Sequence, residues 1–186
     1  MASESPQPSP PAARPADSVA GGAYGPAYYF APACEADLDA ILHVEQAAYP
    51  LPWSRESLRD ILLRQGSQCG DYVMQLLWSQ PATGPAVLQG YFIALLGFEE
   101  MHLLNLAVHP TFQGQGCAVL LLQRLRHCAC AYGAHTLWLE VRESNQRARA
   151  LYQRFGFAEV SVRPNYYPTP SGGREHAVVM QLPLLG

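Results

Sequence analysis

Residues 103–118, LLNLAVHPTFQGQGCA, join an apolar run, a proline and a glycine-rich turn that opens into a helix. The apolar run predicts a buried strand over Asn105–Val108, which Pro110 ends. Apolar residues then recur at helical spacing from Ala118 until Gly133 supplies a stop. The glycines of the turn allow backbone N–H groups at the helix N-terminus to converge on an anion. The stretch therefore predicts a phosphate-binding turn.

The turn differs from two common phosphate motifs. The sequence has no G-x-x-x-x-G-K-S/T stretch, and Gly114 and Gly116 lack the third glycine and the acidic partner of the dinucleotide-binding fingerprint. A P-loop or a Rossmann domain is therefore disfavoured. The remaining pattern, Gln113-x-x-Gly116-x-Ala118, is short, and a glycine turn before an amphipathic helix is more often architecture than a ligand site. Support has to come from elsewhere in the chain.

Length and composition limit the class of protein to which the chain can belong. The 186 residues suggest one domain with enough apolar material for a core. The net charge is −3, and the sequence has no basic stripe and no RNA-binding or zinc-finger spacing, so we expect no direct nucleic-acid binding. Residues 1–25 are rich in proline, alanine, serine and glycine and show no apolar period. We expect them to form a disordered tail before a domain over 26–186.

The sequence shows no signal for export, membrane insertion or metal binding. No charged segment precedes an apolar run, and no apolar stretch approaches the roughly 18 residues of a membrane span, so we expect a cytoplasmic protein. The five cysteines include no C-x-x-C pair. Cys128 and Cys130 are two residues apart on the predicted helix and point in different directions, which disfavours a metal site. We expect no metal, and we interpret Cys117 as a packing residue.

Apolar periodicity along the remaining chain predicts a mixed α/β domain. Strands are expected over Tyr28–Ala31, Asp71–Ser79, Val87–Leu96, Glu100–Val108, Thr136–Arg142, Gly156–Val162 and Glu175–Leu182. Helices are expected over Glu35–Ala48, from the Ser54 cap through Leu62, from Ala118 to Tyr132, and from a cap at Ser144 or Asn145 to Phe155. The short connection at Gly97–Glu99 predicts that the strands around it pair antiparallel, whereas the helical crossover to Thr136–Arg142 predicts a parallel pair.

The segment Tyr49-Pro50-Leu51-Pro52-Trp53 joins the first two predicted helices. Its prolines stop the first helix and stiffen the loop. The aromatic residues Tyr49 and Trp53 then either form the wall of a substrate groove or fill the core, and the sequence leaves both interpretations open.

Two ionisable residues beside the turn have ordinary interpretations when each is taken alone. Alternation along the strand Thr136–Arg142 places Glu140 on the face opposite Leu139, where it is either a solvated carboxylate or a partner of Arg142. Tyr152 shares the apolar stripe of its helix and is by default a core aromatic residue. Each residue gains significance only from the longer stretches around it.

Two such stretches carry a resemblance: NLAVHPTFQGQGCA at 105–118 and LEVRESNQRARALYQRFGF at 139–157. Together they closely resemble the RimI-type ribosomal-protein-alanine N-acetyltransferases of the GNAT superfamily. The likeness extends to EQAAYPLPWSRESL at 45–58 and RPNYYPTPSGGREHAVVMQLPL at 163–184. It implies an α/β structure with the GNAT acyl-CoA N-acyltransferase fold, in which a mixed, mostly antiparallel sheet contains a central parallel strand pair flanked by helices.

The resemblance implies a role for each matching residue. Glu140 corresponds to the general base, Tyr152 to the general acid and Asn145 to a cofactor contact. The implied cofactor-binding residues are Leu106, Ala107 and Val108 for the acetyl-pantetheine arm and Gly114, Gln115, Gly116, Cys117, Ala118 and Val119 for the pyrophosphate of acetyl-CoA. Family members often carry arginines in this turn, whereas here the turn is uncharged. We therefore expect backbone donors and the helix dipole to anchor the cosubstrate.

The implied substrate is the N-terminal alanine of the eighteenth protein of the small ribosomal subunit. Separately, we expect the protein to be a monomer. Trp53, Tyr166 and Tyr167 are candidates for the peptide groove, and Glu99 and Glu100 are candidates for an acidic rim that suits a basic peptide. Two alternatives stay open. One is a GNAT enzyme that acetylates lysine side chains or a small amine, and the other is a non-catalytic CoA-binding module.

Overall fold

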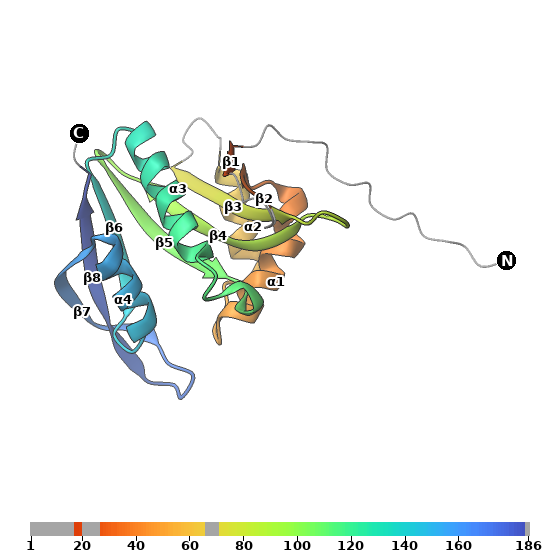
Figure 1. Ribbon diagram of the computed structural model, residues 1–186. Helices are drawn as coiled ribbons and strands as arrows, with labels where there is room; N and C mark the ends of the chain where they lie inside the picture. The colour runs from red at the N-terminus through yellow and green to blue at the C-terminus, as the bar shows by residue number, and fades with distance from the viewer. Residues whose placement is uncertain (1–16, 20–26, 66–70, 185–186) are drawn as a thin grey trace.

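An eight-stranded sheet with helices on both faces makes up the structure, a computed structural model that describes residues 17–19, 27–65 and 71–184 (Figure 1). The strands are β1 (Asp17–Val19), β2 (Ala27–Pro32), β3 (Tyr72–Gln80), β4 (Val87–Leu96), β5 (Glu100–Val108), β6 (Thr136–Arg142), β7 (Ala158–Pro168) and β8 (Arg174–Pro183). The helices are α1 (Leu38–Ala48), α2 (Arg55–Arg64), α3 (Cys117–Ala131) and α4 (Gln146–Phe155), with the 3₁₀ turns η1 (Glu35–Asp37) and η2 (Pro110–Phe112). No helix within the described residues is long and apolar enough to cross a membrane.

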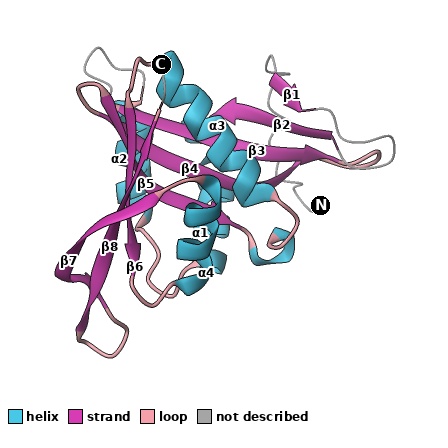
Figure 2. Cartoon of the chain, turned by 60° about the vertical axis from the view of Figure 1, so that its left-hand side comes forward, coloured by secondary structure: helices cyan, strands magenta, loops and turns pink. Residues whose placement is uncertain are grey.

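The strands follow the order β1-β2-β3-β4-β5-β6-β8-β7, and the pair β5 and β6 is parallel, as expected. This pairing runs from Glu100 opposite Thr136 to Leu103 opposite Leu139. Beyond these residues β5 stays with β4 whereas β6 stays with β8 along its whole length, so the two central strands diverge (Figure 2). The parallel pairing therefore uses only the first half of β5 and leaves Asn105–Val108 without β6 beside it.

Alternation along β4 assigns the helices to the two faces of the sheet. Phe92 packs in one buried cluster with Leu121 of α3, whereas Tyr91 and Ile93 belong to a second cluster with Ile41 of α1. Neighbouring residues of a strand point to opposite faces. Helices α3 and α4 therefore cover one face, and α1 and α2 cover the other (Figures 1 and 2).

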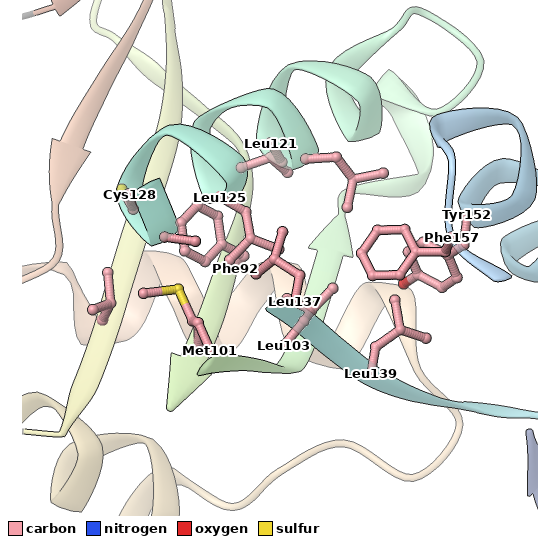
Figure 3. Packing of buried hydrophobic residues seen from close by; sticks show 14 of the residues in the cluster. Phe92, Met101, Leu103, Leu121, Leu125, Cys128, Leu137, Leu139, Tyr152 and Phe157 are labelled. Atoms are coloured by element: carbon pink, nitrogen blue, oxygen red, sulfur yellow. The ribbon is translucent and has the colours of Figure 1, made fainter. Parts of the chain in front are cut away.

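The core beneath α3 extends to α4, as Figure 3 shows. Leu121 of α3 and Phe92 of β4 are fully buried, and burial of a side chain of this size contributes about 2 kcal/mol. At the α4 end, Tyr152 and Phe157 pack edge to face with ring centroids 5.8 Å apart, close to Leu139 of β6. This packing fixes α4, and with it Tyr152, against β6.

Most expected elements are confirmed to within a few residues, and Asn145 rather than Ser144 caps α4. Strand β1 was not expected, because the sequence shows no apolar periodicity there. The strand pairs with β2 through backbone groups. It lies inside the stretch that we expected to form a tail. The rest of that stretch, residues 1–16 and 20–25, lies outside the described residues.

Strand β7 is longer than expected. The sequence predicts an end at Val162, whereas the strand continues to Pro168. Its register against β8 shifts between Arg163 and Tyr167. The shift accommodates Pro164, which has no N–H to donate, and pairing resumes after it.

Candidate active site

A cavity of about 540 Å³ lies where β5 and β6 diverge. Three consecutive residues of β6, Leu139, Glu140 and Val141, line it together with Leu104 and Asn105 of β5. Its lining also includes Glu45 and Ala48 of α1 on one face of the sheet and Ala148 and Tyr152 of α4 on the other, so the cavity reaches through the sheet. Side chains from both faces therefore meet in one space, which we call the first cavity.

A second cavity, of about 350 Å³, continues from the first toward the glycine turn. The two cavities share the lining residues Ala48, Tyr49, Leu106, Asn145 and Ala148. The second cavity lies between the start of α3 and α4. Its lining includes the expected cofactor-binding residues Ala107, Val108, Gly114, Gly116, Cys117, Ala118 and Val119.

The β5 backbone presents hydrogen-bonding groups to the gap. The carbonyl of Leu106 accepts a hydrogen bond from the Tyr49 hydroxyl at 2.6 Å, and the carbonyl of Val108 accepts one from Nε2 of Gln113 at 3.1 Å. Both carbonyls therefore point away from β4. In a strand, the N–H and C=O of one residue point the same way. The N–H groups of Leu106 and Val108 thus also face away from β4 and border the second cavity.

The turn before α3 uses glycine for its backbone conformation. Gly114 and Gly116 have φ of +79° and +86°, in the left-handed region that favours glycine. An added Cβ at either position would meet no atom within 4 Å, so packing does not require glycine there. The first turn of α3 carries backbone N–H groups without intrahelical partners. Cys117 is buried, and burial raises the pKa of its thiol, which agrees with a packing role.

Glu140 presents a carboxylate to the first cavity. Its Oε1 lies 3.2 Å from Nη2 of the more exposed Arg163, and the Tyr167 hydroxyl donates to its backbone carbonyl at 3.0 Å. The interpretation of Glu140 as a partner of Arg142 is wrong. Arg142 instead lies 2.6 Å from Oε1 of Glu175 on β8, because the strand order places β8 next to β6.

Three tyrosines with raised pKa values line the first cavity: Tyr49, which belongs to the loop after α1, and Tyr152 and Tyr167. Burial, assisted by Tyr167, raises the pKa of Tyr152 far above its ordinary value. Burial and the nearby carboxylate of Glu140 raise the pKa of Tyr167 to about 12. All three phenols therefore stay protonated at neutral pH and can donate hydrogen bonds.

A buried polar network, which the sequence analysis missed, borders the first cavity. Glu45 of α1 is 1% exposed. Its carboxyl accepts hydrogen bonds from the backbone N–H of Trp53 at 2.9 Å, the side-chain amide of Asn105 at 3.1 Å and the Tyr91 hydroxyl. The Tyr49 hydroxyl lies 2.9 Å from Oδ1 of Asn105. The network ties the loop after α1 to β5. The sequence signal for it was a glutamate on the apolar stripe of α1, next to an aromatic loop.

The remaining candidate residues divide between the cavities and other surfaces. Trp53 and Tyr167 line the first cavity, and Trp53 also packs against the core, so both interpretations of its loop apply. Tyr166 is exposed and does not line the cavity. Gln115 does not line the second cavity, since its side chain bonds back to η2. Within the described residues, no cluster of three or more histidine, cysteine, aspartate or glutamate side chains could hold a metal ion.

Glu99 and Glu100, the candidates for an acidic rim, lie away from both cavities. Glu100 lies 2.9 Å from His102, and Glu99 lies 3.6 Å from His135. These pairs form at the start of β5, where β6 is still paired with it, and neither glutamate lines the first or the second cavity.

The two cavities differ in the charge of the residues that line them. The charged residues that line the first cavity are Glu45, Glu140, Glu175 and Arg142. The charged residues that line the second are Arg147 and Arg154. The first cavity therefore favours a cationic ligand and the second an anionic one. Their shared boundary is the place where two such ligands would meet.

A glycine turn at a helix N-terminus, a divergent parallel strand pair and a cavity that reaches through the gap define the class of protein. The chain belongs to the acetyltransferase (GNAT) family, which matches residues 38–157. The expected fold and the assignment to the acyltransferases are thereby confirmed.

Relatives narrow this assignment. The chain is 42% identical over 144 residues to the ribosomal protein bS18-alanine N-acetyltransferase of Haemophilus influenzae, covering 77% of this chain and 90% of the relative. It is 38% identical over 148 residues to the protein of the same name from Escherichia coli K12, covering 80% and 92%. The resemblance found in the sequence is therefore confirmed.

Solved structures of other proteins share this fold. The crystal structure of the Escherichia coli ribosomal-protein-S18-alanine N-acetyltransferase has a TM-score of 0.72 at 37% identity and covers 86% of this chain and 96% of its own. The structure of Arabidopsis thaliana NAA60 in complex with acetyl-CoA has a TM-score of 0.73 at 18% identity, covering 86% and 99%. At that lower identity the likeness shows the fold alone.

Proposed function

We propose that this protein is an Nα-acetyltransferase that moves an acetyl group from acetyl-CoA to the N-terminal alanine of the eighteenth protein of the small ribosomal subunit. The observation that carries the proposal is the meeting of an acidic and a basic cavity at the gap between β5 and β6. The names of the relatives at 38–42% identity support the same reaction.

The second cavity suits acetyl-CoA. The residues Gly114, Gln115, Gly116, Cys117, Ala118 and Val119 form the turn and helix start that would hold the pyrophosphate through backbone N–H groups. The N–H groups of Leu106 and Val108 would hold the pantetheine arm along β5. Asn145 lies at the boundary of the two cavities, and its Oδ1 accepts from the Ala148 N–H at 3.1 Å. No hydrogen bond from its amide N–H groups is found among the described residues, so these donors are available to the cosubstrate.

Glu140 is the proposed general base. An N-terminal amine has a pKa of about 8 and is mostly protonated at neutral pH, so it cannot attack a thioester until a base removes a proton. The Glu140 carboxylate faces the first cavity and is held by a single exposed arginine in the described structure, Arg163. A cationic amine that enters the cavity can replace that arginine as the partner of the carboxylate.

Tyr152 is the proposed general acid. Its phenol is protonated at neutral pH, so it can donate a hydrogen bond to the sulfur as the C–S bond breaks, and stabilisation of the phenolate in the site would have to assist the proton transfer because burial raises the pKa of Tyr152. In the complete transfer, the ammonium group first gives one proton to Glu140, directly or through water, and the free amine then forms the N–C bond. As the C–S bond breaks, the nitrogen releases its second proton to water, and the sulfur takes a proton from the Tyr152 hydroxyl, which solvent then replaces. The N–H of Val108, which faces the gap, is a donor for the developing oxyanion.

The first cavity suits a peptide N-terminus. Trp53 and Tyr167 provide aromatic walls, and Glu45, Glu140 and Glu175 make the space acidic. Tyr167 is held in place by the Arg142 guanidinium, which lies 4.5 Å from its ring centre. Such a cavity favours a substrate that carries positive charge near its amino terminus.

Transfer to three acceptors tests the proposal. The first is a peptide that begins Ala-Arg-Tyr-Phe, as the family resemblance implies; the second is the same peptide with a blocked α-amine and an added internal lysine; the third is a polyamine. Tandem mass spectrometry then locates the acetyl group. We expect acetylation of the free α-amine only. Acetylation of the lysine or the polyamine alone would favour the alternative acceptors, and CoA binding without turnover would favour a non-catalytic module.

A further inference from the structure

Positive charge at the second cavity comes from α4 and not from the glycine turn. The turn, residues 113–119, contains no cationic residue. Arg147 and Arg154 line the cavity, together with Leu151. These three residues are spaced i, i+4 and i+7, so they form one stripe along α4. That stripe faces the same cavity as the start of α3.

Arg147 is already attached to the turn. Its Nη1 donates to Oε1 of Gln113 at 2.9 Å, and Nε2 of the same glutamine donates to the Val108 carbonyl at 3.1 Å. A guanidinium has five N–H donors in a fixed planar arrangement. The contact with Gln113 uses one of these N–H groups and holds the guanidinium at the turn, so its remaining donors lie close to the turn.

The third arginine of α4 behaves differently. Arg149 lies 2.8 Å from Oε1 of Glu159 on β7 and lines neither cavity. No ion pair of this kind is found for Arg147 or Arg154 among the described residues, and both are exposed. The stripe therefore carries two positive charges that no carboxylate in the described structure balances.

We propose that Arg147 and Arg154 bind the phosphate groups of CoA, so that α4 supplies the positive charge that the turn lacks. This inference rests on the proposed function, because it assigns these phosphates to the second cavity. Backbone donors of the turn and two guanidinium groups approach the cavity from opposite sides. Arginine suits the role because its planar donors can contact a phosphate in pairs.

Calorimetric binding tests the inference without any need for turnover. Coenzyme A and pantetheine, which lacks phosphate, are titrated into the wild type, Arg147→Ala, Arg154→Ala and the double variant at low and high salt. Arg126→Ala is the matched control, since Arg126 is an exposed arginine of α3 that lines neither cavity. We expect each α4 substitution to weaken coenzyme A binding about tenfold at low salt. Pantetheine binding and the control stay at the wild-type level.

Further readouts separate charge from folding. Thermal unfolding temperatures should stay the same or rise slightly, because alanine is the better helix former. Arg147→Lys should recover part of the lost affinity. A double variant that binds coenzyme A as tightly as the wild type, or a loss of equal size in Arg126→Ala, would overturn the inference. Wild-type protein that fails to bind coenzyme A would instead overturn the proposed function.

Discussion

Glu140 and Tyr152 each have an ordinary structural role as well as a proposed chemical one. Glu140 forms an ion pair with Arg163, and Tyr152 packs against Phe157 in the core. What distinguishes them is that the gap between β5 and β6 exposes both to one cavity. Substitutions that keep the shape of each side chain therefore separate the chemistry from the packing.

Glu140→Gln keeps the volume of the side chain and removes the proposed base. We expect kcat with the peptide to fall about 10²- to 10³-fold at neutral pH, while the Kd for acetyl-CoA stays unchanged. The variant should regain rate as the pH rises toward about 8, because the amine then loses its proton without help. Steady-state kinetics across this range measure the effect. Wild-type kcat in the variant at neutral pH would remove Glu140 from the mechanism.

Tyr152→Phe keeps the edge-to-face contact with Phe157 and removes the hydroxyl. We expect kcat to fall about 10²-fold with little change in the free energy of unfolding. Tyr132→Phe is the matched control, because Tyr132 is exposed at the end of α3 and lines neither cavity. Equal rates in the two variants would argue against an acid role for Tyr152.

The sequence identified individual residues well where a local pattern or a family motif contained them. Alternation placed Glu140 on the less buried face of β6, and glycine positions marked the turn. Contacts between residues that are far apart in the sequence could not be predicted. The pairing of Glu140 with Arg163 depends on the order of β6, β8 and β7, and the arginines of α4 became part of a cavity only once that helix lay beside α3.

The conformation of the loop after α1 depends on the buried hydrogen-bond network around Glu45. We expect Glu45→Ala to lower the free energy of unfolding by about 3 kcal/mol, because it leaves the Trp53 N–H, Tyr91 and Asn105 donors without their shared acceptor. It should also raise KM for the peptide more than the Kd for acetyl-CoA. Urea denaturation and kinetics provide the two readouts.

The matched control for Glu45→Ala is Asp39→Ala on the same helix. Asp39 is 83% exposed and pairs with Arg55 at 2.6 Å. An exposed ion pair contributes less than about 1 kcal/mol, so the control should stay close to the wild type. A comparable loss of stability in the two variants would mean that the buried network has no special role.

Element boundaries were predictable because apolar periodicity determined them locally. Strands β4, β5 and β6 begin and end at the residues that the pattern indicates. The divergence of β5 from β6 was not predictable, since it arises from their separate pairing with β4 and β8. Strand β1 was missed for a similar reason, because its pairing with β2 involves backbone groups and leaves no trace in side-chain patterning.

The whole molecule should lose stability at alkaline pH. Burial raises the pKa of Tyr49, Tyr91 and Tyr152 above the ordinary value of 10.0, and that of Tyr167 to about 12. Above about pH 10 the unfolded chain releases these protons while the folded chain retains them. The unfolded state then binds fewer protons, so stability falls as pH rises, by up to about 1.4 kcal/mol per pH unit for each tyrosine.

Urea denaturation followed by far-ultraviolet circular dichroism, from about pH 8 to about pH 11, measures this loss. Tyr152→Phe should reduce the slope of stability against pH above about pH 10. Tyr132→Phe should not, because Tyr132 is exposed. A free energy of unfolding that stays constant across the whole range would contradict the assignment.

The two cavities should bind the two reactants next to each other, acetyl-CoA in the basic second cavity and the peptide in the acidic first cavity, with their reacting groups at the gap between β5 and β6. The most direct measurement is the affinity of a conjugate that joins the CoA sulfur, through an acetyl linker, to the α-amine of the Ala-Arg-Tyr-Phe peptide. We expect one conjugate to bind per chain, at least about 100-fold more tightly than coenzyme A alone. The bound CoA part raises the local concentration of the peptide part at the first cavity. A conjugate that binds no more tightly than coenzyme A would mean that the two cavities do not hold the two reactants together.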